Sequence, residues 1–178
     1  MHVQSEAAAQ VKPAQAPFDF EATFRAQYVR VARIIARVVR DPARAEELAV
    51  EVFLKLWRNP HAQGEKTEAW LYRVAVRKAL DELRRRTRRT RYESVLGFVK
   101  RVPTPEDIRA TVEEQERVIL ILAALDSRQS ELLLLCSQGL TYDELAVALD
   151  LNPASVGTFL SRAQQAFRKE YVKRYGKK

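Results

Sequence analysis

An arginine-rich helix face that also carries a tryptophan is the part of this sequence with the clearest chemistry. Between residues 69 and 91, spacing at about 100° per residue separates an apolar side from a polar side, which we name the arginine face. Guanidinium groups bind phosphates, and an indole ring can stack on an unpaired base. The pattern therefore predicts contact with a nucleic acid. The arginine face consists of Trp70, Arg73, Arg77, Asp81, Arg84 and Arg88.

The same spacing allows a second interpretation, a plain surface helix. In that case Trp70 packs under a neighbouring element, and Asp81 pairs with an arginine three or four residues away. The charge of the whole chain favours the nucleic acid, because 31 Lys and Arg residues outnumber 23 Asp and Glu residues and give a net charge of +8. The run from Arg84 to Arg91 concentrates positive potential at one end of the helix.

Polar side chains also gather on a helix near the end of the chain, predicted from Asn152 to about Lys173. A short helix precedes it and begins with the capping-box spacing of Thr141 and Glu144. A short and a long helix joined by a tight turn are typical of a helix-turn-helix, whose second helix enters the major groove of DNA. A plain pair of packed helices is the alternative.

The predicted helix over 42–58 has two apolar stripes instead of one. Ala45, Leu48, Val52 and Leu56 form the first stripe, and Val50, Phe53, Leu54 and Trp57 form the second. Such a helix must be covered on two sides. It is either central to a three-helix domain or gives its second stripe to a partner protein, and both can hold.

The periodicities and the scarcity of glycine, with 5 in 178 residues, predict an all-α protein made of two small helical domains joined by a flexible linker. Pro103 and Pro105 mark the linker. We predict a flexible tail over 1–17, a first domain of three to four helices over 18–91, the linker over 92–112, a helix-turn-helix domain over 113–173 and a basic tail over 174–178.

Several classes of protein are excluded by composition. The single cysteine, Cys136, lies next to an apolar run and is expected to be a buried thiol, so disulfide and Cys-rich zinc frameworks do not fit. No apolar run reaches the length of a membrane span, and we expect a soluble, intracellular protein. His2 and His61 are isolated, and no glycine-rich phosphate loop occurs. We therefore expect no enzyme activity, no metal and no cofactor.

The order of motifs along the chain closely resembles bacterial sigma factors. Ala45-Glu-Glu-Leu, Glu51-Val-Phe-Leu-Lys-Leu-Trp57, Trp70-Leu-Tyr-Arg-Val-Ala75 and Ala79-Leu-Asp-Glu-Leu-Arg-Arg85 are similar to sigma region 2. Ala124-Leu-Asp-Ser-Arg-Gln129 and Gly139-Leu-Thr-Tyr-Asp-Glu-Leu-Ala146, with the helix after Asn152, are similar to region 4. The resemblance covers about residues 18–172 and leaves no room for regions 1.1 and 3, so the chain is similar to the extracytoplasmic-function (group IV) type.

The resemblance implies a subunit that binds core RNA polymerase in the bacterial cytoplasm, directs it to promoter DNA and helps to open the duplex. The resemblance also implies an anti-sigma factor as a further partner.

The resemblance also assigns roles to three sets of residues. The segment that docks on the polymerase clamp helices contains Glu46, Glu47, Leu48, Glu51, Phe53, Leu54 and Trp57. The loop over 59–67 and the helix after it match the part that reads the −10 element and holds a flipped base, with Trp70, Arg73, Arg77, Lys78, Asp81, Arg84 and Arg85 as candidates. The −35 reader is expected to use Ser155, Thr158, Ser161, Arg162, Gln165 and Arg168.

Two departures from the family pattern limit this transfer. Arg77 stands where the family usually has Asn, and Gly157-Thr158-Phe159 stands where relatives commonly carry a basic-Ser-basic triplet. Phe159 either packs inward or meets a thymine methyl group. The −35 preference of other members therefore does not carry over.

Two other classes of function compete with the sigma factor. A helix-turn-helix regulator that binds DNA without polymerase would explain residues 139–169, but would leave the arginine face and the helix over 42–58 without a role. A sigma-like adaptor that binds only a regulatory protein would not need the DNA-binding residues.

Overall fold

The computed structural model describes residues 18–95 and 106–176, and the regular elements in these ranges are all helical. They are α1 (Phe20–Val39), α2 (Pro42–Trp57), η1 (Pro60–Ala62), α3 (Thr67–Val95), α4 (Glu106–Ala124), α5 (Ser127–Ser137), α6 (Tyr142–Leu149), η2 (Pro153–Ser155) and α7 (Val156–Tyr175). The all-α class predicted from the sequence is confirmed. The predicted tail over 1–17, and Pro103 to Pro105 of the predicted linker, lie outside the described residues.

Helix ends follow the capping residues that the sequence predicts. The carboxylate of Asp41 accepts a hydrogen bond of 3.1 Å from the N–H of Arg44, and Pro42 is the first residue of α2. Thr141 and Glu144 form the capping box of α6. Gly139 follows α5 with a φ of +81°, a left-handed conformation that glycine adopts without strain.

Helices α1, α2 and α3, which we call the first unit, bury one apolar core. Phe53 lies at its centre and is 2% exposed, and its ring centre lies 4.8 Å from that of Phe24 in an edge-on arrangement. Phe20 and Tyr28 complete the aromatic cluster around it. The other fully buried large side chains of this unit are Val31, Ile34, Ile35, Val52, Leu56, Leu71, Val76 and Leu80.

Helices α4 to α7 form the second unit. Its buried apolar side chains include Ile121, Leu132, Leu135, Leu145, Val156, Leu160 and Ala163. Within it, α6, the turn with η2, and α7 make the predicted helix-turn-helix. Cys136 is half-buried on α5 rather than fully buried. No helix in the parts of the chain that the structure describes is long and apolar enough to cross a membrane.

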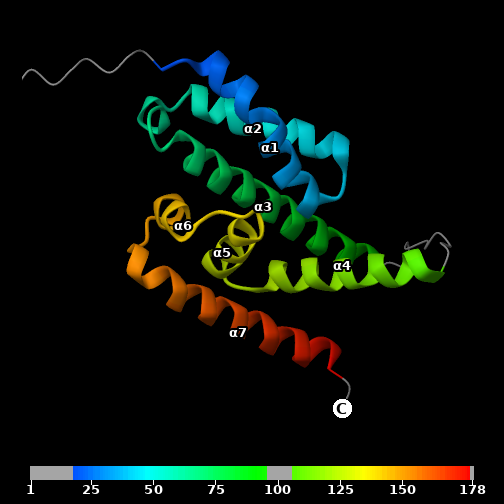
Figure 1. The fold of residues 1–178 in the computed structure, drawn as a ribbon. Helices are drawn as coiled ribbons and strands as arrows, with labels where there is room; N and C mark the ends of the chain where they lie inside the picture. Colours follow the sequence, from blue (N-terminus) through cyan, green and yellow to red (C-terminus); the bar gives the residue numbers. More distant parts are fainter. Residues whose placement is uncertain (1–17, 96–105, 177–178) are drawn as a thin grey trace, which may run out of the picture.

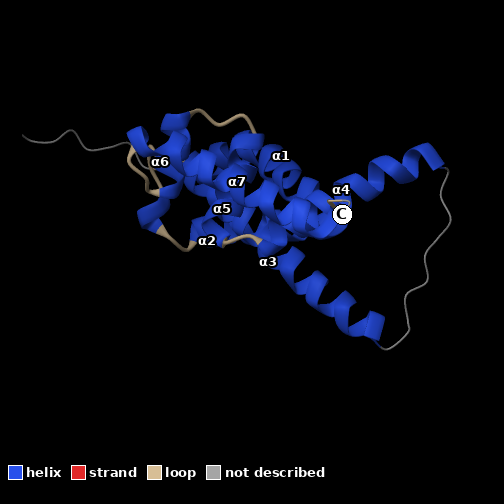
Figure 2. Ribbon diagram, turned by 90° about the horizontal axis from the view of Figure 1, so that it is seen from below, coloured by secondary structure: helices blue, strands red, loops and turns tan. Residues whose placement is uncertain are grey.

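The two units pack against each other with α3 between them. In Figure 1, α1 and α2 lie on one side of α3 and α5 and α6 lie on the other, and α3 contacts all four helices. The end of α3 and the start of α4 extend from this body on the same side (Figure 2). The sequence predicts two domains joined by a flexible linker, and in the structure their described residues also contact each other directly, because polar groups of α3 bind groups of α4 and α5. Helical periodicity cannot reveal such contacts, since it reports only one helix at a time.

Candidate nucleic-acid interface

The arginine face of α3 is the surface against which the second unit packs. Trp70, Arg73 and Arg84 are half-buried there, whereas Arg77 and Asp81 are exposed. The apolar side of the same helix, including Leu71, is buried in the first unit as predicted. Five residues of the predicted −10 set therefore share one side of α3, and parts of this side are covered by α5 and α6.

Arg77 forms an ion pair across the boundary between the units. Its Nε donates to the carboxylate of Glu131 on α5 over 2.8 Å, and the Glu131 side chain is only 6% exposed. The Arg77 side chain is still half exposed. The alternative that Arg77 is the partner of Asp81 is therefore wrong for this structure. Glu131 was not singled out from the sequence, because it ends the polar first turns of α5, just before the apolar run from Leu132, and its partner is 54 residues away.

Arg84 forms hydrogen bonds that link α3 to the turn between α4 and α5. Its guanidinium donates to the carbonyl oxygens of Ala123 and Leu125, each over 3.3 Å, and to the hydroxyl of Ser127 over 2.9 Å. These carbonyls lie at the end of α4, where backbone acceptors have no partner within the helix. A cation at this position satisfies them.

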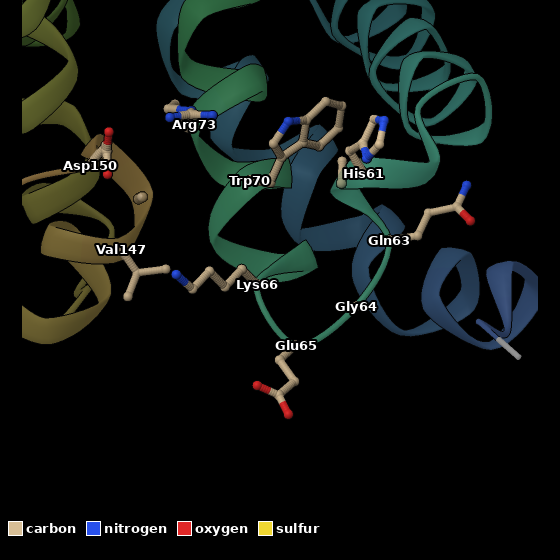
Figure 3. Close-up of a pocket in the computed structure, with 11 residues that line it drawn as sticks. His61, Gln63, Gly64, Glu65, Lys66, Trp70, Arg73, Val147 and Asp150 are labelled. Carbon is tan, nitrogen blue, oxygen red and sulfur yellow. The ribbon is translucent and has the colours of Figure 1, made fainter. Parts of the chain in front are cut away.

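A cleft of about 520 Å³ lies beside Trp70, between the loop over 61–66 and α6. Figure 3 shows the Trp70 indole beside His61, Asp150 facing Arg73, and Val147 facing Lys66. The first unit supplies the aromatic and basic walls of this cleft, and α6 supplies the opposite wall. We call it the Trp70 cleft. An aromatic ring at the rim of a basic cleft is suited to stacking against an unpaired base.

Arg73 is half-buried in the wall of this cleft. Burial lowers the pKa of its guanidinium, and the positive charge of Arg77 lowers it further. The carboxylates of Glu131 and Asp150 oppose this effect. The Nε of Arg73 is buried and has no hydrogen-bond partner among the described residues. A buried donor without a partner is costly, so Arg73 would gain from a rearrangement that brings an acceptor to Nε.

Lys78 lies beside the arginine face and binds α2. Its Nζ donates to Glu51 over 2.5 Å. The predicted −10 set and the predicted polymerase-binding set thus touch each other at this pair. A contact of polymerase with Glu51 would therefore also act on the position of Lys78.

Arg85 belongs to a different cluster, which sequence reasoning missed. Together with Arg44 and Arg86 it donates to the carboxylate of Glu82, which is buried between α2 and α3. Burial raises the pKa of Glu82, but hydrogen bonds from the three arginines outweigh burial and hold that pKa at about 2. Arg85 thus stabilises the first unit, even though most of its side chain remains accessible.

The outer face of α2 exposes part of the second apolar stripe. Leu54 is 47% exposed and Trp57 is 62% exposed, while Glu46 and Glu47 are exposed beside them. We call these four residues the outer face of α2. The Trp57 ring is supported by Phe20, with its ring centre 4.9 Å away in an edge-on arrangement.

Two predicted polymerase-binding residues lie inside the first unit. Leu48 and Phe53 are buried in the core, which corrects their prediction as contact residues. Leu48 belongs to the first apolar stripe of α2 and Phe53 to the second. A helix that is packed on two sides buries one stripe and part of the other. Leu48 and Phe53 therefore pack beneath the outer face of α2 and are not part of its surface.

The predicted −35 residues lie on the outward side of α7 and at its start. Thr158, Ser161, Arg162, Gln165 and Arg168 are exposed, and Ser155 is half-buried at the end of η2. Phe159 is 37% exposed and lines a small groove with Leu132 and Leu149. At Gly157, a Cβ would lie 3.6 Å from the ring of Tyr142.

Comparison with known proteins identifies the family of the chain. Residues 23–89 match the sequence profile of sigma-70 region 2, and residues 115–166 match that of sigma-70 region 4. The chain is 31% identical to the ECF RNA polymerase sigma factor SigK of Mycolicibacterium vanbaalenii over 157 residues, which cover 84% of this chain and 80% of that protein. It is 32% identical to SigK of Mycobacterium tuberculosis over 147 residues, which cover 78% and 76% of the two chains.

Two solved structures share the fold. One is the sigma factor RpoE in complex with the anti-sigma factor NepR from Bartonella quintana, with a TM-score of 0.50, 17% identity, and coverage of 85% of this chain and 96% of that one. The other is CnrH in complex with the cytosolic domain of CnrY, with a TM-score of 0.51, 19% identity, and coverage of 84% and 85%. The chain therefore belongs to the sigma-70 family, and it is a sigma factor of the extracytoplasmic-function type that acts in transcription initiation.

Proposed function

We propose that this sigma factor binds core RNA polymerase through the outer face of α2. The observation that carries this proposal is the exposed apolar pair Leu54 and Trp57 beside the acidic residues Glu46 and Glu47. An exposed apolar patch rimmed by charge is typical of a protein interface. The clamp helices of polymerase are the partner that the family resemblance implies for this segment. Glu51 is the polar member of the same set, and its contact with Lys78 links the interface to α3.

The −10 element is read, on this proposal, by the arginine face and the Trp70 cleft. Arg73 and Arg77 would bind backbone phosphates or base edges, and Trp70 would stack on a base taken from the non-template strand. Extracting a base costs a few kcal/mol, which stacking and phosphate contacts must offset. Lys78, Asp81, Arg84 and Arg85 complete the candidate set, with Arg85 restrained by Glu82.

The −35 element is read by α7 in the major groove. Hydroxyl, amide and guanidinium groups along its exposed side can bond both phosphates and base edges. Base contacts are assigned to Thr158, Ser161 and Arg162, which are exposed on α7. Ser155, Gln165 and Arg168 flank them and are assigned to the backbone.

The proposal places the chain in the bacterial cytoplasm, where polymerase and promoters are, and gives it no catalytic step of its own. The competing function is a helix-turn-helix regulator that needs no polymerase. That alternative leaves the outer face of α2 and the Trp70 cleft without a ligand. Transcription in vitro separates the two directly, because only a sigma factor makes initiation by core polymerase depend on its presence.

The experiment uses purified bacterial core polymerase, this protein and a library of templates with a randomised promoter region. Sequencing of the transcribed templates should return two enriched blocks at one fixed spacing. Core polymerase alone is the control. Transcripts that do not depend on the added protein, or a single enriched block that the protein selects equally well without polymerase, would contradict the proposal.

A further inference from the structure

We propose that Thr67 is a positioning residue for the −10 reader: its hydroxyl holds the loop over 61–66, before DNA binds, in the shape that makes one wall of the Trp70 cleft. The inference rests on the proposed role of that cleft in −10 recognition. It adds a residue that acts on the promoter through the loop, without touching DNA itself.

The loop supplies a large part of the lining of the Trp70 cleft. Its residues from His61 to Lys66 all line the cleft, and Trp70 follows them in the first turn of α3. In Figure 3 the chain runs from His61 past Gly64 to the helix that carries Trp70. The side chains of His61, Glu65 and Lys66 are exposed and accessible to a base. The position of the loop relative to Trp70 therefore decides the shape of the cleft.

Gly64 lies in the middle of this loop in a conformation that other residues rarely adopt. Its φ is +151°, and a Cβ built on it would have open space around it. Glycine is the most permissive residue of the backbone, and no side chain of Gly64 can pack to keep it in one conformation. A group outside Gly64 must therefore hold this part of the loop.

The hydroxyl of Thr67 holds the backbone on both sides of Gly64. Its Oγ1 accepts a hydrogen bond of 2.8 Å from the N–H of Gly64. The hydroxyl hydrogen is directed toward the carbonyl oxygens of Ala62 and Gly64, which lie 2.8 and 2.7 Å away. The N–H of Thr67 adds a bond of 3.1 Å to the carbonyl of Gly64. Thr67 is only 4% exposed, so water competes weakly for these bonds.

Gln63 ties the same loop to the end of α2. Its Nε2 donates to the carbonyl oxygens of Leu56 over 3.1 Å and of Trp57 over 3.4 Å. These two residues are the last of α2, where carbonyl groups lack partners within the helix. The loop is thus attached to the helix that carries the proposed polymerase site and, through Thr67, to the helix that carries Trp70.

A loop that is already held in its binding shape needs no ordering when a base arrives. Ordering a flexible segment on binding lowers the affinity. Loss of the Thr67 hydroxyl should reduce the fraction of molecules whose loop is ready to bind, and the apparent Kd rises as that fraction falls. The groups that meet DNA stay the same, because Thr67 is buried behind the loop.

The test compares variants that separate the hydroxyl from the shape of the side chain. Thr67→Val keeps the shape and removes the hydroxyl, whereas Thr67→Ser keeps the hydroxyl. Thr87→Val is the matched control on the same helix, because the Thr87 hydroxyl donates only within α3, to the carbonyl of Leu83 over 2.9 Å. Trp70→Ala is measured beside them and reports on the cleft itself.

Two quantities are measured for each full-length protein. The first is the Kd of its holoenzyme for a fluorescein-labelled single-stranded oligonucleotide that carries the −10 block selected in the transcription library. The second is amide hydrogen exchange of residues 61–66 in the protein without polymerase. We expect Thr67→Val to raise the Kd about tenfold and to speed exchange in the loop. Thr67→Ser and Thr87→Val should stay within about twofold of the parent Kd, with exchange of the loop unchanged.

The fold of each variant is checked by circular dichroism and by its affinity for core polymerase, which should not change. Gln63→Met decides the test if Thr67→Val does not fold, since Gln63 is half-buried and methionine has a similar length without a donor. We expect this variant to raise the Kd about threefold and to speed exchange in the loop.

Three results would overturn the inference. The folded Thr67→Val variant, or Gln63→Met in its place, binds the oligonucleotide as tightly as the parent; Thr67→Ser loses as much affinity as Thr67→Val; or Thr87→Val loses as much as either. If Trp70→Ala weakens binding and Thr67→Val does not, only the role of Thr67 fails. If Trp70→Ala also binds as tightly as the parent, the −10 assignment of the Trp70 cleft fails, and this inference fails with it.

Discussion

Arg77 and Glu131 are ion-paired over 2.8 Å although 54 residues separate them in the sequence. Arg77 is also the position at which the chain departs from the asparagine that is usual in the family. The departure therefore has a structural counterpart in this chain, since a guanidinium reaches a buried carboxylate of the neighbouring unit. An asparagine at the same position carries no charge and could not form this ion pair.

The outer face of α2 is expected to bind polymerase without being needed for folding. Leu54→Glu should weaken binding to core polymerase by tenfold or more, because it places a charge in an apolar contact, while the helical circular-dichroism signal stays nearly unchanged. Val29→Glu makes the same change at an exposed apolar residue of α1 and is the matched control. Loss of fold in Leu54→Glu, or equal binding by both variants, would count against the assignment.

The −10 and −35 readers should be separable by mutation. In holoenzyme, Trp70→Ala should weaken binding to a single-stranded −10 oligonucleotide about tenfold, because a stacked base is worth ~1–3 kcal/mol. It should leave binding to a duplex −35 fragment unchanged. Arg162→Ala should show the opposite pattern, since its exposed guanidinium lies on α7. The two DNA probes come from promoters selected in the transcription library. Equal losses on both probes for both variants would remove the proposed division.

The Glu82 cluster should make stability depend on pH in the acid range. The fold lowers the pKa of Glu82 from 4.5 to about 2, so the ionised carboxylate stabilises the fold above about pH 4.5 and this contribution is lost as the pH falls toward 2. Glu82→Gln should therefore lower the free energy of unfolding by about 2 kcal/mol at pH 7 and by much less near pH 2.5. Urea unfolding at the two pH values measures both numbers.

Glu116→Gln is the control for the Glu82 experiment, because it removes an exposed carboxylate of the second unit. Its effect on stability should stay within about 0.5 kcal/mol at both pH values. A loss for Glu82→Gln that is the same at both pH values would show that the cluster acts through packing and not through the charge of Glu82.

Of the two glycines Gly139 and Gly157, only Gly139, in the turn before α6, should be needed for stability. Gly139→Ala should destabilise the protein by about 1 kcal/mol, because a φ of +81° is strained for alanine even though open space surrounds the site. Gly157→Ala should be neutral or slightly stabilising, because Gly157 is helical and its new methyl group would rest 3.6 Å from Tyr142. Thermal unfolding of the two variants tests this contrast. Equal effects would mean that backbone conformation is not the cause.

Local features of this chain could be predicted from the sequence because each depends on neighbours within one helix. The caps at Asp41 and Thr141, the glycine after α5 and the apolar stripes of α1 to α3 all follow from spacing of a few residues. The predicted −35 residues on the outer side of α7 are exposed for the same reason, apart from the half-buried Ser155.

Contacts between elements far apart in the sequence could not be predicted in this way. Glu82 and Glu131 each lie where helical periodicity gives no sign of burial, and each is held by arginines that come wholly or partly from another helix. Leu48 and Phe53 were assigned to a contact surface because the segment as a whole matched a polymerase-binding motif. Which side of a doubly apolar helix is covered depends on the packing of α1 and α3, and that information is not local.

Dependence of initiation on this protein is the most direct test of its function as a sigma factor. Purified core polymerase is incubated with a promoter template selected from the library, together with the parent protein, with Leu54→Glu or with no addition, and the transcripts are quantified. The parent protein should give transcripts that core polymerase alone does not give, and Leu54→Glu should give about tenfold fewer at a polymerase concentration that saturates only the parent protein. Equal transcription with and without the protein would contradict this function.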